Sequence, residues 1–141
     1  MSSDYSLYGQ DNQTNKTIVF IHGVGLNRQV WQPQVDHFSN RHQVLVYDML
    51  GHGASRLPNE TVTLNDYVVQ LADLISTLAL EPVTLVGHSM GALVAVAFAL
   101  AHPKKAKALV PMNIVYQRTK AQQEAVLARA KKVLVDGKVT G

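Results

Sequence analysis

The sequence predicts an α/β fold with a mostly parallel sheet covered by helices on both faces. Short apolar runs rich in β-branched residues alternate along the chain with segments of helical periodicity. Such alternation favours right-handed β–α–β crossovers, which place parallel strands in one sheet and helices against its two faces. With 141 residues, 47% hydrophobic and 16% charged residues, the chain can form one globular domain.

The predicted strands are short apolar runs, and the first two of them are typical of strands buried on both faces. They are Thr17–Ile21, Gln43–Tyr47, residues 83–86 and Ala106–Met112. The first strand leads into a glycine loop at residues 22–25, and the second leads through Asp48 into a turn at residues 51–55. Because ligands of open α/β sheets bind beyond the carboxyl ends of the strands, we expect these loops to meet at one edge of the sheet.

The predicted helices have apolar residues at helical spacing. The first has Trp31, Val35 and Phe38 at i, i+4 and i+7, with Pro33 tolerated in its first turn. The second begins at Thr63 with a capping box closed by an Asp three residues later, and it ends before residues 81–82 (Glu-Pro). Its predicted buried face is Tyr67, Val68, Leu71, Leu74, Ile75 and Leu78. A third, almost wholly apolar helix follows Ser89.

The sequence Gly87-His88-Ser89-Met90-Gly91 joins a predicted strand to a predicted helix. A Gly-x-Ser-x-Gly pattern in this context is typical of a nucleophile elbow, in which a serine occupies a tight turn above a parallel sheet. The turn forces the serine toward a strained backbone conformation, and the two glycines let strand and helix approach closely. The N–H of Met90, at the start of the helix, would face an oxyanion beside the serine. Ser89 is therefore the predicted nucleophile.

The chain resembles the α/β-hydrolase superfamily, in its serine-nucleophile branch. The matching blocks, in order, are Phe20-Ile21-His22-Gly23, Tyr47-Asp48 with residues 51–55, the helix at 63–78, the elbow at 87–91 and Ala101-His102-Pro103. The resemblance implies that Ser89 is the catalytic residue and that the backbone N–H groups of Val24 and Met90 form its oxyanion hole. It also implies a set of supporting residues: His22, Gly23, Gly87, His88 and Gly91.

Only the amino-terminal half of that fold is matched. The resemblance implies that residues 1–113 form the amino-terminal part of the hydrolase core. It implies that residues 114–141, which include an amphipathic helix at 117–136, begin a helical cap over the site.

The family supplies a catalytic acid and then a histidine after the serine. After Ser89 the only histidine is His102, whose place at the end of the predicted helix points it away from the site. The only acids are Glu124 and Asp136, both on the predicted cap helix, and Asn113 stands where some members place the acid. We therefore expect this chain to lack the acid and the base of the triad.

The remaining histidines receive other roles. His22 is expected to brace the oxyanion loop, His52 belongs to a Gly-His-Gly turn, and the side chain of His88 is expected to point away from its neighbour Ser89. By resemblance, Asp48 organises the turn at 51–55. The six histidines lack a helical metal-ligand spacing, so neither a metal nor a cofactor is predicted.

Composition excludes several other classes of function. The chain has no cysteine, which rules out disulfides and thiolate chemistry, and its net charge of +3, with scattered aromatics, does not favour a nucleic-acid surface. The longest apolar run, residues 92–101, is too short for a membrane span, and residues 1–6 do not resemble a signal peptide. The expectation is a cytoplasmic protein without membrane or nucleic-acid partners.

Two functions remain open. The first is a serine hydrolase of an ester or related carbonyl substrate, present here as an incomplete chain that is inactive alone; esterase, lactonase, C–C hydrolase and cofactor-free haloperoxidase chemistry are all compatible with it. The second is a non-catalytic binding module that associates through the strand Ala106–Met112, which is expected to be an exposed sheet edge and open to self-association. The coding sequence beyond Gly141 would distinguish the two.

Overall fold

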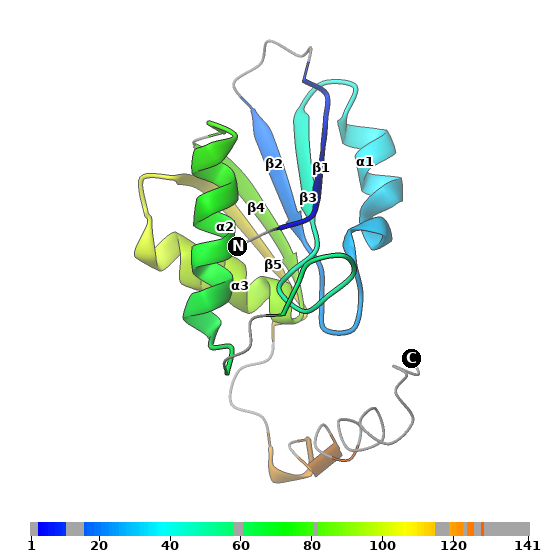
Figure 1. Ribbon diagram of the computed structural model, residues 1–141, viewed down its shortest axis with the longest axis vertical. Helices are drawn as coiled ribbons and strands as arrows, with labels where there is room; N and C mark the ends of the chain where they lie inside the picture. Colours follow the sequence, from blue (N-terminus) through cyan, green and yellow to red (C-terminus); the bar gives the residue numbers. More distant parts are fainter. Residues whose placement is uncertain are drawn as a thin grey trace.

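A computed structural model describes residues 3–10, 16–57, 61–80, 82–114, 119–122, 124, 125 and 128. Its strands are β1 (Tyr5–Tyr8), β2 (Thr17–Ile21), β3 (Gln43–Tyr47), β4 (Val83–His88) and β5 (Ala106–Met112). Its helices are the 3₁₀ turn η1 (Arg28–Trp31), α1 (Gln32–Phe38), α2 (Leu64–Thr77) and α3 (Met90–Ala101). Figure 1 shows α1 on one face of the sheet and α2 and α3 on the other. The predicted α/β class is therefore confirmed.

The sheet has the strand order β1-β3-β2-β4-β5. Strands β3, β2, β4 and β5 are parallel, and β1 pairs antiparallel with β3 along one edge. The sequence pattern predicts no strand at β1. This strand has only four residues and a half-polar sequence, Tyr-Ser-Leu-Tyr, which is too short to show a period of its own.

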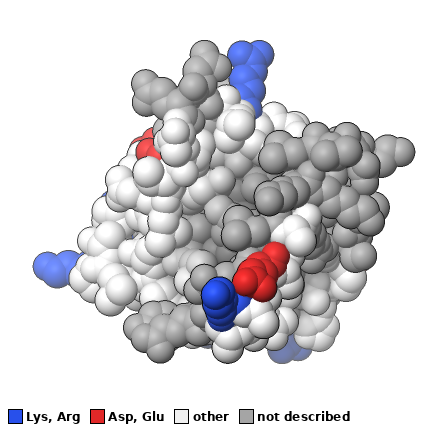
Figure 2. Space-filling view, turned by 90° about the horizontal axis from the view of Figure 1, so that it is seen from below, with Lys and Arg blue, Asp and Glu red and all other residues white. Residues whose placement is uncertain are grey.

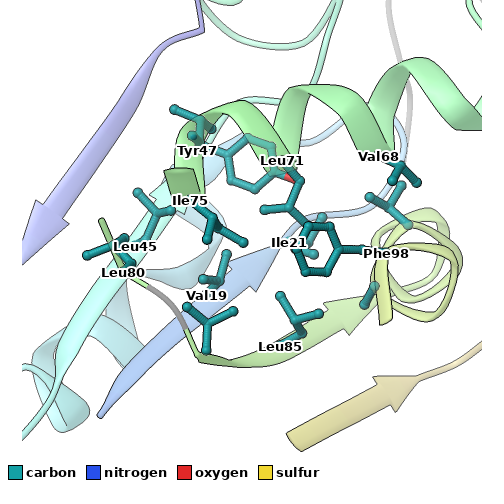
Figure 3. Close-up of a cluster of buried hydrophobic side chains, with 14 of the residues drawn as sticks. Val19, Ile21, Leu45, Tyr47, Val68, Leu71, Ile75, Leu80, Leu85 and Phe98 are labelled. Carbon is teal, nitrogen blue, oxygen red and sulfur yellow. The ribbon is translucent and has the colours of Figure 1, made fainter. Parts of the chain in front are cut away.

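Alternate residues of the central strands enter different cores, because successive side chains of a strand point to opposite faces. Val19 and Ile21 of β2 lie in a core shared with α2 and α3, whereas Phe20 packs with Trp31 and Val35 on the α1 face. Figure 3 shows the larger core, in which Leu71 and Ile75 of α2 and Phe98 of α3 meet the strands. This two-sided burial explains why the strands read as continuous apolar runs.

The predicted start of α2 is confirmed in detail. The carboxylate of Asp66 accepts a hydrogen bond of 2.7 Å from the N–H of Thr63, as a capping box requires. Val68, Leu71, Leu74 and Ile75 are buried as predicted, with the polar Gln70 among them. The prediction was wrong for Tyr67 and Leu78, which are only partly buried because they lie at the margin of the core.

One predicted boundary, the end of β4, differs in the structure, and one predicted helix lies mostly outside the described residues. Strand β4 extends two residues past 86, because Gly87 and His88 continue to pair with β5. The predicted helix at 117–136 lies mostly outside the described residues. Within this range, the described residues 120–122, 124, 125 and 128 are helical and exposed. The division into a core at 1–113 and a cap at 114–141 stays a prediction. Among the described helices, none is long and apolar enough to cross a membrane.

Candidate active site

Ser89 occupies the junction between β4 and α3. Its backbone angles are φ 56° and ψ −115°, a left-handed conformation that L-residues rarely adopt. The junction is fixed by two hydrogen bonds: Ser89 N–H donates to the carbonyl oxygen of Met112 at 2.9 Å, and Ala92 N–H donates to the carbonyl oxygen of Ser89 at 3.0 Å. The predicted strained strand-to-helix turn is therefore present. The Ser89 hydroxyl has no hydrogen-bond partner among the described residues.

The two glycines of the elbow stand where backbones approach closely. A Cβ at Gly91 would overlap the carbonyl oxygen of Ile21 and lie 2.6 Å from that of His22. A Cβ at Gly87 would overlap the carbonyl oxygen of Gly91 and lie 2.7 Å from the nitrogen of Ala92. Both distances are far below van der Waals contact, so only glycine fits. The first turn of α3 is thereby held against β2 as well as β4.

The glycine loop after β2 lies against the elbow. An ideal Cβ at Gly23 would be 3.4 Å from the Cβ of Ser89, so the space between the loop and the serine holds no more than a methyl group. Leu26 N–H donates to the carbonyl oxygen of Gly23 at 3.2 Å, which closes the loop, and Val24 stands 64% exposed at its tip. Within the described part of the chain, the N–H groups of Val24 and Met90 have no hydrogen-bond acceptor. Their convergence into one oxyanion hole stays a prediction.

His22 braces this loop from the core. Its side chain is 0% exposed; Nδ1 donates to the carbonyl oxygen of Gly23 at 2.7 Å, and Nε2 accepts from the N–H of Met49 at 3.0 Å. These two bonds define a neutral imidazole with its proton on Nδ1. Burial lowers the pKa of His22 below 6.5, and the nearby His52 adds to that effect, against raising contributions from the Gly23 bond and from Asp48.

We expect acid to destabilise the fold through His22. The unfolded chain protonates this imidazole near pH 6.5, whereas the folded chain does so only at lower pH. The stability from neutral His22 is complete above that value and is lost as the pH falls toward the lowered folded pKa, at no more than about 1.4 kcal/mol per pH unit. Urea unfolding followed by circular dichroism, from about pH 7.5 to about pH 5.5, measures the slope.

The matched variant is His22→Gln, which keeps an acceptor for Met49 but cannot titrate. Its stability should fall less steeply with acid than that of the parent chain, while the exposed His37→Gln should keep the parent slope. Equal slopes in the parent and in His22→Gln would show that His22 is not the acid-sensitive group.

Asp48 organises the turn after β3, as the resemblance implied. Its buried carboxylate accepts hydrogen bonds from Arg28 N–H at 2.7 Å, from the Arg28 guanidinium at 2.7 Å and from Ala54 N–H at 3.0 Å. The Ser55 hydroxyl donates to the Asp48 carbonyl oxygen at 2.6 Å, and Arg28 also pairs with Asp4 at 2.6 Å. Asp48 therefore ties the loop after β2 to the loop after β3, and it is fully engaged in this structural role.

The other histidines are engaged away from the Ser89 hydroxyl. The ring of His52 lies 5.0 Å from that of His22, and its Nδ1 is 3.0 Å from the carbonyl oxygen of Leu50. Nε2 of His88 is 3.1 Å from the amide nitrogen of Asn113, and His102 packs against Phe98 at the far end of α3. Of the described residues, none is placed as a base hydrogen-bonded to Ser89.

A cavity of about 240 Å³ lies beside the elbow, between the loop after β2 and the ends of β4 and β5. Its polar lining comes from His22, Gln34 and His88, and its apolar lining from Leu26, Val30, Trp31 and Met112. The sequence pattern places Trp31 only on the apolar side of a helix and does not single out Gln34. Their spacing of three residues, which puts them on one side of a helical turn, was the available signal.

The end of the molecule that carries the strand termini has few charges. Figure 1 places the loops after β2, β3 and β4 together at this end. Figure 2 shows that end of the molecule, where the described surface carries only scattered lysine, arginine and acidic side chains. No group of three His, Cys, Asp or Glu side chains in the described residues could hold a metal ion.

Comparison with known proteins gives consistent results. A family model described as alpha/beta hydrolase fold matches residues 16–133. The (E)-2-((N-methylformamido)methylene)succinate hydrolase of Acinetobacter baylyi is 37% identical over 130 residues, which are 92% of this chain and 49% of that protein.

Solved structures show the same likeness. An α/β-hydrolase enzyme from a Medee basin deep-sea metagenome library matches with a TM-score of 0.87 and 26% identity, over 94% of this chain and 48% of that one. The crystal structure of E-2-(acetamidomethylene)succinate hydrolase matches with a TM-score of 0.83 and 29% identity, over 92% of this chain and 47% of that one. The chain thus spans about half the length of these proteins.

Proposed function

Because this chain belongs to the α/β-hydrolase family, we propose that Ser89 is the nucleophile of a hydrolase acting on an ester or a related carbonyl compound. The observation that carries the proposal is the strained conformation of Ser89 at φ 56°, with room for no more than a methyl group between its side chain and Gly23. A non-glycine residue is held in such a conformation only where the surrounding structure enforces it, and such sites cluster at catalytic centres.

In the proposed reaction the Ser89 oxygen adds to the carbonyl carbon while its proton passes to a base. The carbonyl oxygen becomes an oxyanion, which accepts hydrogen bonds from the N–H groups of Val24 and Met90. Collapse expels the leaving group, which takes the proton, and leaves an acyl-enzyme that water hydrolyses. The relative from A. baylyi hydrolyses a formamido compound, which supports including amides beside esters.

No described side chain forms a hydrogen bond with the Ser89 hydroxyl, and we propose that the base and the acid of this reaction do not come from the described residues. Without a base, the Ser89 hydroxyl is a weak nucleophile at neutral pH. We expect the 141-residue chain to hydrolyse p-nitrophenyl acetate no faster than its Ser89→Ala variant, because oxyanion stabilisation alone accelerates attack by water equally in both. Initial rates of p-nitrophenolate release measure this difference.

A fluorophosphonate probe tests the nucleophile itself. After long incubation, peptide mass spectrometry should find Ser89 modified at least about tenfold more than the exposed Ser76. The reason is that oxyanion-hole donors stabilise the transition state in which the serine oxygen is phosphonylated. Equal modification of Ser89 and Ser76 would contradict the proposal. Turnover that depends on Ser89 would instead reveal a base in this chain, and His22, His52 and His88 would be the positions to mutate.

A second candidate function is favoured by the position of β5. This strand forms an edge of the sheet and pairs only with β4 among the described strands, and its Val110 is 45% exposed. An apolar edge strand is a template for pairing with another chain, so the chain would act as a binding module that self-associates. Sedimentation velocity of the same samples decides: oligomers together with an unlabelled Ser89 would favour the binding module over the enzyme.

A further inference from the structure

We propose that Gln70 is a positioning residue of the oxyanion hole. Acting through the loop after β3 and through His22, it fixes the direction in which the N–H of Val24 points. This inference rests on the proposed function, because it takes that N–H as an oxyanion donor.

Gln70 is a buried polar residue of α2, only 1% exposed. Glutamine is rarely buried to this extent, because an unpaired amide in a core is costly. Its side-chain oxygen accepts a hydrogen bond from Leu50 N–H at 3.1 Å. Its nitrogen donates to the carbonyl oxygen of Asp48 at 3.0 Å and to the Ser3 hydroxyl at 3.2 Å. A backbone N–H can only donate and a carbonyl can only accept, so these partners also fix the orientation of the amide.

The two backbone bonds of Gln70 lie on either side of Met49, which is fully buried. The N–H of Met49 itself donates to Nε2 of His22 at 3.0 Å. Three consecutive residues after β3 are therefore held by two buried side chains, one from α2 and one from the loop after β2. A shift of residues 48–50 would move the donor that holds the His22 ring.

His22 passes this constraint to the peptide that joins Gly23 and Val24. Because Nε2 accepts from Met49, the proton of the neutral ring is on Nδ1, which donates to the carbonyl oxygen of Gly23 at 2.7 Å. Leu26 N–H donates to the same oxygen at 3.2 Å. A peptide unit is planar and trans, so its N–H points in the direction opposite to its carbonyl. With this carbonyl held by the ring, the N–H of Val24 is turned away from His22.

Burial makes this chain of contacts sensitive to its first member. Gln70, Leu50 and His22 are each at most 1% exposed, so water cannot easily replace a lost partner. A methionine at position 70 has nearly the volume of glutamine, but it would leave the N–H of Leu50 unpaired. We expect residues 48–50 to move in recovering a partner, and the His22 ring to lose its fixed acceptor role.

The Gln70→Met variant tests this expectation with two independent measurements. In ¹⁵N NMR spectra, the His22 ring should change from the Nδ1–H tautomer to a mixture of tautomers, and the amide signal of Val24 should shift. The rate at which a fluorophosphonate labels Ser89 should fall about tenfold. Removal of a whole oxyanion-hole donor typically costs about a hundredfold or more, and a misdirected donor loses part of that effect.

A double-variant cycle tests the route. His22→Gln replaces the ring that links Met49 to Gly23, so adding Gln70→Met to it should slow the labelling no further, whereas independent effects would multiply. Ser3→Ala removes the one bond of Gln70 that does not reach the loop after β3 and should leave both measurements unchanged. Ile75→Val, at a buried apolar position of the same helix, controls for a loss of core packing and should also leave them unchanged.

The parent chain provides a test that needs no variant: an Nε2–H tautomer of His22 in its NMR spectrum would overturn the inference. The same holds for an unchanged Val24 signal in folded Gln70→Met, for effects that multiply in the double variant, and for equal slowing by Ile75→Val. If parent Ser89 is labelled no more than Ser76, the proposed nucleophile is wrong. The NMR signals do not depend on the serine, so they still decide whether Gln70 directs the N–H of Val24.

Discussion

The Gly91→Ala variant is expected to be at least about 3 kcal/mol less stable than the parent chain, although alanine is the better helix former. Gly91 is in the first turn of α3, where alanine would gain about 1 kcal/mol from helix propensity. The added Cβ would overlap the carbonyl oxygen of Ile21, a backbone atom of the central strand β2 that cannot move without breaking its pairing. The overlap costs more free energy than the helix propensity gains, so we expect the substitution to lower the free energy of unfolding.

Urea unfolding of the variant, followed by circular dichroism, measures this loss. Gly23→Ala serves as the graded control, because its Cβ would lie 3.3–3.4 Å from His88 and Ser89 atoms, a tight contact that small shifts can relieve. It should cost clearly less than Gly91→Ala. A Gly91→Ala chain as stable as the parent would mean that α3 does not approach β2 as closely as described.

The Asp48→Asn variant is expected to lose about 3 kcal/mol of stability, because it leaves a buried set of donors partly unpaired. Asp48 is 2% exposed and accepts two hydrogen bonds from Arg28 and one from Ala54. An asparagine keeps one acceptor oxygen but turns an NH₂ group toward donors that already point at it. The negative charge beside the guanidinium is lost as well.

Asp4→Asn is the matched control, since Asp4 binds the same guanidinium from a side chain that is 42% exposed. Exposed ion pairs contribute little, so this change should cost less than about 1 kcal/mol. Chemical denaturation of both variants gives the comparison. Similar losses from the two substitutions would show that burial does not determine the value of this network.

The sequence was sufficient to predict the parallel strands and the elbow, for a physical reason. Strands buried on both faces are apolar at nearly every position, so β2 and β3 stood out, and a strand that turns directly into a helix needs the two glycines around Ser89. The sequence predicts that His22 braces the loop after β2 and that Asp48 organises the next turn, but it does not predict their hydrogen-bond partners. That His22 receives the N–H of Met49 depends on how two loops meet, which no local pattern records.

The cavity and β1 could not be predicted from the sequence. The cavity is formed by residues from the loop after β2, η1, α1, β4 and β5, which come together from distant parts of the chain, so its existence depends on packing and not on periodicity. Trp31 fitted a helix core equally well on spacing alone. Strand β1 is defined by its pairing with β3, and four half-polar residues carry no such information by themselves.

The bond from Ser89 N–H to the Met112 carbonyl oxygen bears on the order in which the chain is made. All the groups assigned to the elbow and its loops lie between His22 and Met112, and β5, which carries Met112, follows β4 in the chain and lies beside it in the sheet. On the ribosome, this bond cannot form before Met112 has left the exit tunnel, because its acceptor is the carbonyl oxygen of that residue. The hydrogen bonds that fix Ser89 are therefore complete only after β5 has been synthesised.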